Sequence, residues 1–93
     1  MDLPVLYESI TIPERKLIRE EYIRLQKGLC SYCGMPLSES PDASVACKSV
    51  DRSLFPPKFF DWPIHLHHSH DTGLTIGAVH CYCNAVLWQY DGE

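Results

Sequence analysis

Hydrophobic residues recur at helical spacing in the first third of the chain. Successive members lie three to four positions apart, which is the period of one helix face. These residues are Ile18, Tyr22, Leu25 and Leu29. Thr11 and Glu14 have the Thr-x-x-Glu spacing of a capping box, and Gly28 is a typical stop signal. The pattern predicts a helix over residues 11–28.

The last third of the chain has the pattern of two strands and a helix. Residues 64–68 and 74–79 are rich in β-branched and apolar residues, and Asp71-Thr72-Gly73 between them is a turn signal. We therefore expect a β-hairpin over residues 64–79. Apolar residues at helical spacing then predict a final helix over 83–90.

The middle of the chain, residues 34–63, is expected to be loop-rich because it contains five prolines. Only Ser44 to Val50 has the composition of a short strand. The stretch from Phe55 to Pro63 places four aromatic residues among three prolines. Such a loop can stack bases or dock a protein, but covering a small core is the commoner use.

Composition favours one small domain that is stabilised by zinc. The chain has 93 residues, of which 45% are hydrophobic, and it contains five cysteines. No apolar run reaches the roughly 20 residues of a membrane span, and the N-terminus does not resemble a signal peptide. We therefore expect a cytoplasmic protein with no membrane partner, in which so many cysteines indicate metal binding rather than disulfides. The expected fold class is α+β, with a single domain over residues 1–93.

The charge balance does not by itself indicate a nucleic-acid binder. Eight basic and 12 acidic residues give a net charge of −4, and all the basic residues lie at or before Lys58. Five basic residues belong to the predicted first helix: Arg15, Lys16, Arg19, Arg24 and Lys27. They either face phosphate or form an ordinary solvated, ion-paired surface, which is the usual meaning of such a pattern.

Two cysteine-containing segments have the spacing of a zinc site. Residues 30–33 read Cys-Ser-Tyr-Cys and are followed by a glycine, as in one half of a zinc knuckle. The second half lies in His80-Cys81-Tyr82-Cys83, where His80 with Cys83 repeats the knuckle spacing. The favoured zinc ligands are therefore Cys30, Cys33, His80 and Cys83. Pairing Cys81 with Cys83 is the alternative; otherwise Cys81 and Cys47 are ordinary buried cysteines.

A second cation site is suggested by four histidines within six residues. They are His65, His67, His68 and His70. Strand alternation predicts that the side chains of His65 and His67 lie on one face and that of His68 on the other. A non-catalytic cluster or a set of solvated histidines is the alternative interpretation.

The C-terminal motifs resemble those of HNH endonucleases, in particular the recombination endonuclease VII group. The resemblance covers residues 30–33 and 64–88 and runs through His67-His68-Ser69-His70, Thr72-Gly73, Gly77 and His80-x-x-Cys83-Asn84-x-x-Leu87. It implies a ββα-metal (His-Me) finger, here with an N-terminal helix, that hydrolyses DNA.

The resemblance also implies a role for each matching residue. His68 corresponds to the general base, while His67 and Asn84 correspond to ligands of a catalytic Mg²⁺ or Mn²⁺. His70 matches a further active-site histidine that contacts phosphate or helps to place the metal. The implied products carry 5′-phosphate and 3′-hydroxyl ends.

Three residues depart from the pattern of that group. His67 replaces an aspartate, which favours Mn²⁺, Ni²⁺ or Co²⁺ over Mg²⁺. Ile76 replaces an arginine, and His80 replaces a cysteine that binds zinc. A competing register uses Asp51-Arg52, but it leaves the four-histidine segment unexplained.

These observations predict a metal-dependent DNA endonuclease with structural zinc. Because basic residues are few, we expect weak, salt-sensitive DNA binding and nicking or weakly specific cleavage, unless a homodimer combines two basic faces. The alternative is a non-catalytic zinc module that binds nucleic acid or protein.

Overall fold

The first helix of the fold begins at a complete capping box. The computed structural model describes residues 2–92, so Met1 and Glu93, the ends of the predicted domain, lie outside the described residues. Helix α1 spans Ile12–Leu25, and Thr11 and Glu14 cap it with reciprocal hydrogen bonds. The helix ends three residues before the predicted limit, because Lys27 and Gly28 both adopt positive φ.

Only part of the predicted apolar face of α1 is buried. Ile18 and Tyr22 are in the core, whereas Leu25 and Leu29 are 54% and 42% exposed. Leu25 is the last residue of the helix and Leu29 lies beyond it, so the chain has left the face that packs on the hairpin.

The predicted hairpin is present and contains an irregularity at the histidines. Strand β1 (Ile64–His68) pairs antiparallel with β2 (Thr75–His80), with Ile64 opposite His80. The register shifts between His67 and His68, which pair with Gly77 and Thr75 and skip Ile76. Such a bulge interrupts the alternation of side chains and redirects the strand.

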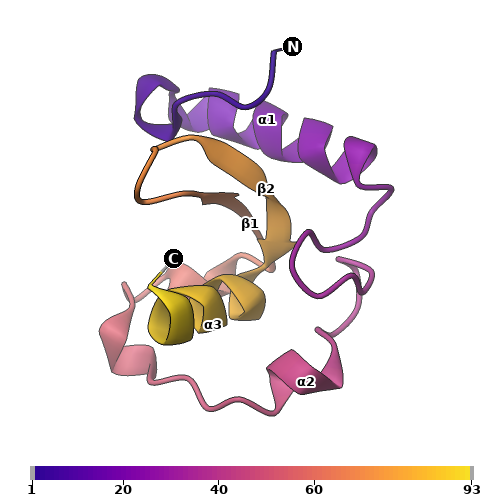
Figure 1. Cartoon of the computed structure of the whole chain (residues 1–93), viewed down its shortest axis with the longest axis vertical. Helices are drawn as coiled ribbons and strands as arrows, with labels where there is room; N and C mark the ends of the chain where they lie inside the picture. The colour runs from indigo at the N-terminus through magenta and orange to yellow at the C-terminus, as the bar shows by residue number, and fades with distance from the viewer. Residues whose placement is uncertain (1, 93) are drawn as a thin grey trace.

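Helices lie on both sides of the hairpin (Figure 1). Helix α3 (Cys81–Asp91) follows β2 directly and begins two residues before its predicted start. In Figure 1, α1 lies above the hairpin and α3 below it. Ala78 and Val79, adjacent residues of β2, both have 0% exposure, as expected for a strand that is covered on its two faces.

The loop-rich middle contains a short helix where a strand was expected. Residues Ala43–Ala46 form α2, so the predicted strand from Ser44 to Val50 was wrong. Asp42 accepts a hydrogen bond from the Ser44 N–H and caps this helix. The remaining short elements are single 3-10 turns at Tyr7–Ser9, Arg52–Leu54 and Phe59–Asp61.

The described residues form a small α+β fold with one two-stranded sheet and three α-helices. The core joins side chains from α1, the segment 30–37, α2, the hairpin and α3: Ile18, Tyr22, Cys30, Leu37, Val45, Leu66, Ala78, Val79, Cys83 and Val86. None of the helices among residues 2–92 combines the length and apolar content that crossing a membrane requires.

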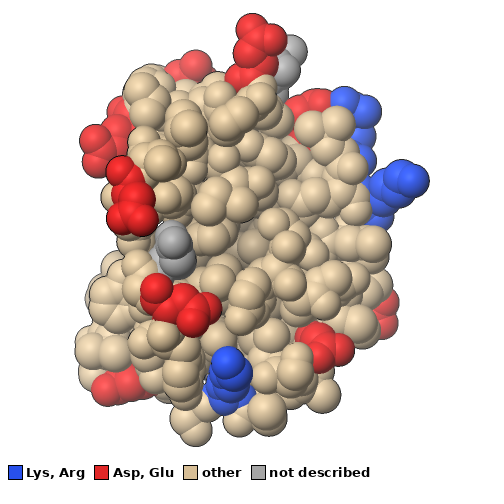
Figure 2. All heavy atoms as spheres, viewed as in Figure 1, with Lys and Arg blue, Asp and Glu red and all other residues tan. Residues whose placement is uncertain are grey.

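The surface carries no extended basic region on the face shown in Figure 2. Acidic side chains are scattered over this face, most of them along its upper and left edges. Basic side chains are confined to the upper right and to one point at the bottom. This distribution agrees with the net charge of −4.

Candidate metal centre and adjoining cleft

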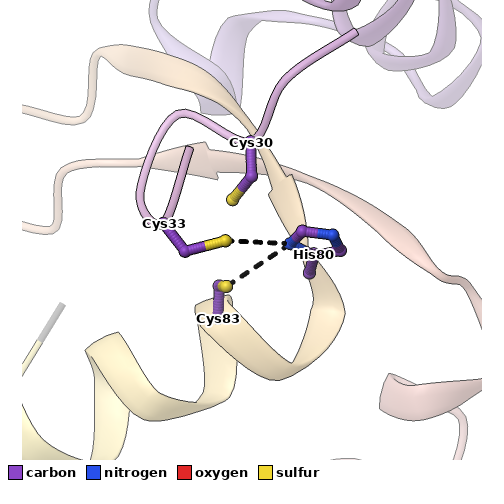
Figure 3. Close-up of side chains that lie close together, drawn as sticks. All are labelled: Cys30, Cys33, His80 and Cys83. Atoms are coloured by element: carbon purple, nitrogen blue, oxygen red, sulfur yellow. Dashed lines mark hydrogen bonds between the residues drawn. The ribbon is translucent and has the colours of Figure 1, made fainter. Parts of the chain in front are cut away.

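Four side chains from two distant segments converge on one point (Figure 3). Cys30 and Cys33 come from the loop after α1, His80 ends β2, and Cys83 lies in the first turn of α3. Their potential ligand atoms all lie within 4.8 Å of one another. Three thiols and an imidazole are a typical zinc ligand set, so this group can hold a structural metal ion such as zinc.

The distances within this group suit tetrahedral coordination. The Nδ1 atom of His80 lies 3.5 Å from the Sγ atoms of Cys33 and Cys83. Zinc bonds of about 2.3 Å to sulfur and about 2.0 Å to nitrogen, at a tetrahedral angle, separate those atoms by about 3.5 Å. The side chains therefore already have the spacing that a bound ion requires.

A second hydrogen bond orients the His80 ring. The Nε2 atom lies 2.9 Å from the carbonyl oxygen of Pro36. Because a carbonyl can only accept, Nε2 carries a proton, and Nδ1 is the ring nitrogen turned toward the thiols. Metal-binding histidines are commonly held by such an outer hydrogen bond.

The crowding of the thiols shifts their pKa values in opposite directions. A hydrogen bond from Cys83, aided by backbone groups, lowers the pKa of Cys30 to about 4. The hydrogen bond to Cys30, together with burial and the neighbouring thiolates, raises the pKa of Cys83. A cation at the centre removes the repulsion that keeps Cys83 protonated.

The zinc-knuckle loop is docked on β2 through Gln26. The Gln26 side chain accepts from the Ala78 N–H at 2.9 Å and donates to the Ala78 carbonyl at 2.9 Å. Ser31 N–H also donates to the Ala78 carbonyl at 3.0 Å. This close approach needs Gly77, because a Cβ there would lie 2.7 Å from Gln26 Oε1 and 2.9 Å from Ser31. Gln26 was missed in the sequence, where it resembles an ordinary surface residue.

The other two cysteines do not belong to the group. Cys81 is half-buried and Cys47 is exposed, and neither is among the four converging residues. The register that pairs His80 with Cys83 is thus the one that the fold brings together. The expectation that Cys47 is buried was wrong, since it lies just after the short helix α2.

A cleft of about 480 Å³ crosses β1 between α1 and α3. All the candidate catalytic residues line it, namely His67, His68, His70 and Asn84. His65 and Arg19 also contribute, as do aromatic residues of the loop before β1. Strict alternation predicted opposite faces for His67 and His68, but both reach this cleft, and the bulge lies between them.

The His68 ring lies between aromatic and cationic neighbours. It stacks on the Tyr7 ring with a centroid distance of 3.9 Å and lies 5.1 Å from the His70 ring. Burial lowers the pKa of His68, as do electrostatic interactions with His70, His67 and Arg15, while the Glu8 carboxylate acts in the opposite direction. The Arg15 guanidinium lies 4.2 Å above the Tyr7 ring. The ring of His68 is thus held in a neutral form beside a cation.

The basic residues of α1 divide into two sets. Arg19 lines the cleft, and Arg15 lies close enough to His68 to affect its pKa. Arg24 instead forms an exposed ion pair with Glu21. Of these three arginines, Arg15 and Arg19 are therefore the ones that lie near the histidines.

His65 contacts Asn84 and was not expected to have a role of its own. Its Nδ1 lies 3.1 Å from Asn84 Nδ2, and its Nε2 lies 2.8 Å from the Phe59 carbonyl. Burial lowers the pKa of His65, which favours its neutral form. Strand alternation predicted that the side chains of His65 and His67 share one face of the strand, but no pattern in the sequence indicated the contact with Phe59.

Within residues 2–92, the Cys3His group is the only set of three or more His, Cys, Asp or Glu side chains with converging ligand atoms. The histidines of residues 65–70 do not form a second set of that kind. Comparison of the chain with protein-family models, curated proteins and solved structures returned no match.

Proposed function

We propose that this chain is a metal-dependent DNA endonuclease built as a ββα-metal finger, with zinc at the Cys3His group. The observation that carries the proposal is the shared cleft of His67, His68 and Asn84, next to Arg19. The order of the elements supports the proposal further. Helix α3 follows the hairpin directly, and His80 at the end of β2 lies close to Cys83 in this helix.

The residues of the cleft match the needs of phosphodiester hydrolysis. His68 takes a proton from a water molecule whose oxygen attacks phosphorus. A new phosphorus–oxygen bond forms as the bond to the 3′ oxygen breaks, and that oxygen leaves with a proton from solvent. The products carry 5′-phosphate and 3′-hydroxyl ends. Arg19 and His70 lie where they can contact the phosphate.

His67 and Asn84 are the residues that would hold a catalytic divalent cation. An imidazole nitrogen and an amide oxygen suit Mn²⁺, Ni²⁺ or Co²⁺, and Mg²⁺ less well. An ion bound there would stabilise the negative charge of the leaving oxygen. The donor set fits this assignment because the Asn84 nitrogen is engaged with His65, so its oxygen is available.

Cleavage of supercoiled plasmid tests the proposal. Zinc-loaded protein is incubated at low salt with Mn²⁺, Mg²⁺ or Ni²⁺, or with no added metal, and the ends of the products are analysed. We expect metal-dependent relaxation and 5′-phosphate ends. Ends with 3′-phosphate would contradict the mechanism. Absence of cleavage with any of these metals, in a folded and zinc-loaded chain, would favour the non-catalytic zinc module.

A further inference from the structure

The cleft has two chemically different walls. The imidazole wall consists of Arg19, His65, His67, His68, His70 and Asn84. The second wall, called the aromatic wall, consists of Leu54, Phe55, Pro56, Phe59, Trp62 and Trp88. Among the described residues that line the cleft, none carries a carboxylate, although the chain is acidic overall. The cleft therefore suits a ligand that is anionic on one side and flat and apolar on the other.

The aromatic wall is ordered by its own ring contacts. The Phe55 ring lies 4.7 Å from Phe59 and 5.3 Å from Trp88, and Phe59 packs edge-on against His65 at 4.6 Å. Because the imidazole of His65 also bonds to the Phe59 carbonyl, the aromatic wall is anchored to the imidazole wall at this point. The wall is thus a preformed surface beside the histidines.

Part of the aromatic wall is exposed to solvent. Trp62 is 67% exposed and Trp88 is 41% exposed, although both line the cleft. Phe60 differs, because the Arg52 guanidinium lies 4.1 Å above its ring and Phe60 does not line the cleft. The phenylalanines of this loop are half-buried and pack on one another, whereas the indoles of Trp62 and Trp88 keep much of their surface exposed.

We propose that this cleft binds an unpaired nucleotide, with its phosphate on the imidazole wall and its base stacked on the aromatic wall. A paired base is stacked between its neighbours in a duplex and offers aromatic side chains no free face, whereas a single strand does. The volume of about 480 Å³ falls within the range of about 300–1,000 Å³ that is common for small-molecule sites. The inference rests on the proposed function and specifies its substrate as a single-stranded or locally unpaired nucleic acid.

Binding can be measured without cleavage. Both tryptophans of the chain line the cleft, so intrinsic fluorescence reports on base stacking. The zinc-loaded His68→Ala variant is titrated with a DNA single strand, an RNA single strand of the same sequence and the corresponding DNA duplex. We expect quenching by a single strand with an affinity at least about tenfold above that of the duplex, since stacking contributes about 1–3 kcal/mol per base. Equal quenching by duplex and single strands, or no quenching by either single strand, would overturn the inference.

Cleavage then separates this inference from the proposed function. The wild-type chain is given a DNA duplex with a central unpaired tract and a fully paired duplex, and the ratio of the two cleavage rates is measured. We expect a ratio above about ten that falls toward one in Trp62→Ala and is retained in Trp62→Phe. Leu17→Ala, which truncates another exposed hydrophobic residue away from the cleft, is the matched control. Equal rates on both duplexes would refute the substrate preference and leave the nuclease intact. Selective binding of single strands without any cleavage would refute the nuclease and support the nucleotide site.

Discussion

The imidazole of His65 fixes the orientation of the Asn84 amide. Its Nε2 must donate to the Phe59 carbonyl at 2.8 Å, so its Nδ1 is an acceptor and receives the Asn84 Nδ2–H at 3.1 Å. The amide oxygen of Asn84 is consequently left for another partner. In the proposed nuclease, that partner is the catalytic cation, and His65 is a positioning residue.

Replacing His65 should therefore weaken the response to the catalytic metal. We expect His65→Ala to need about 10- to 100-fold more Mn²⁺ for half-maximal cleavage, as is typical when the outer partner of a ligand is lost. Saturating Mn²⁺ should restore much of the rate, whereas Asn84→Ala should stay inactive. The measurement is the cleavage rate against Mn²⁺ concentration for zinc-loaded proteins. An unchanged Mn²⁺ dependence in His65→Ala would show that the contact only supports the fold.

Loss of one thiol of the Cys3His group should remove the structural metal. We expect the wild-type chain to bind one zinc ion. Cys83→Ser should lose both the zinc ion and the cooperative unfolding transition, because Cys83 is fully buried at the junction of β2 and α3. Zinc content and thermal unfolding provide the measurements.

Two further cysteines serve as controls for that experiment. Cys47→Ser and Cys81→Ser should keep both zinc and the unfolding temperature, since neither side chain belongs to the group. If Cys81→Ser loses zinc and His80→Ala retains it, then Cys81 rather than His80 binds zinc together with Cys83.

The contact between the zinc-knuckle loop and β2 should be sensitive to one added methyl group. Gly77→Ala places a Cβ 2.7 Å from Gln26 Oε1 and 2.9 Å from Ser31, so the loop must shift. Overpacking of this kind typically costs about 1–3 kcal/mol of the free energy of unfolding. Denaturant unfolding measures this loss of free energy. The control is Ile76→Ala, which changes the neighbouring exposed residue. Equal stabilities of the two variants would mean that the loop is not held against the strand.

A buried hydrogen bond between α1 and the hairpin gives a smaller effect. The Tyr22 hydroxyl lies 2.9 Å from Thr75 Oγ1, which also accepts from the Val5 N–H. Tyr22→Phe removes this link and should lower the free energy of unfolding by about 1 kcal/mol. A domain of this size then unfolds roughly 4–8 °C lower. Thermal unfolding by circular dichroism checks the shift, and an unchanged midpoint would refute the stabilising role of the bond.

Local spacing made the metal centre predictable from the sequence. The separation of three positions in Cys30-x-x-Cys33 and in His80-x-x-Cys83 restricts where each pair can point, so the ligand set followed from short-range geometry. The capping box at Thr11 and Glu14 located the start of α1 for the same reason.

Features that depend on distant packing were not predictable. The bulge between His67 and His68 interrupts the strand alternation on which the predicted faces of these two side chains depended. The contact of His65 with Phe59 depends on the path of a proline-rich loop. The short helix α2 is a different case. Asp42 before Ala43 is a capping signal that can be seen in the sequence, but the β-branched Val45 and Val50 favoured a strand prediction instead.

Cleavage by zinc-loaded His68→Ala tests the proposed chemistry most directly. The variant is compared with wild type on supercoiled plasmid with Mn²⁺, after zinc content and unfolding temperature have been matched, and both are assayed with and without added imidazole. If His68 is the general base, cleavage falls by about 10²–10⁴-fold and is partly restored by free imidazole. Wild-type rates in the folded, zinc-loaded variant would contradict a general-base role for His68 and the catalytic site proposed around it.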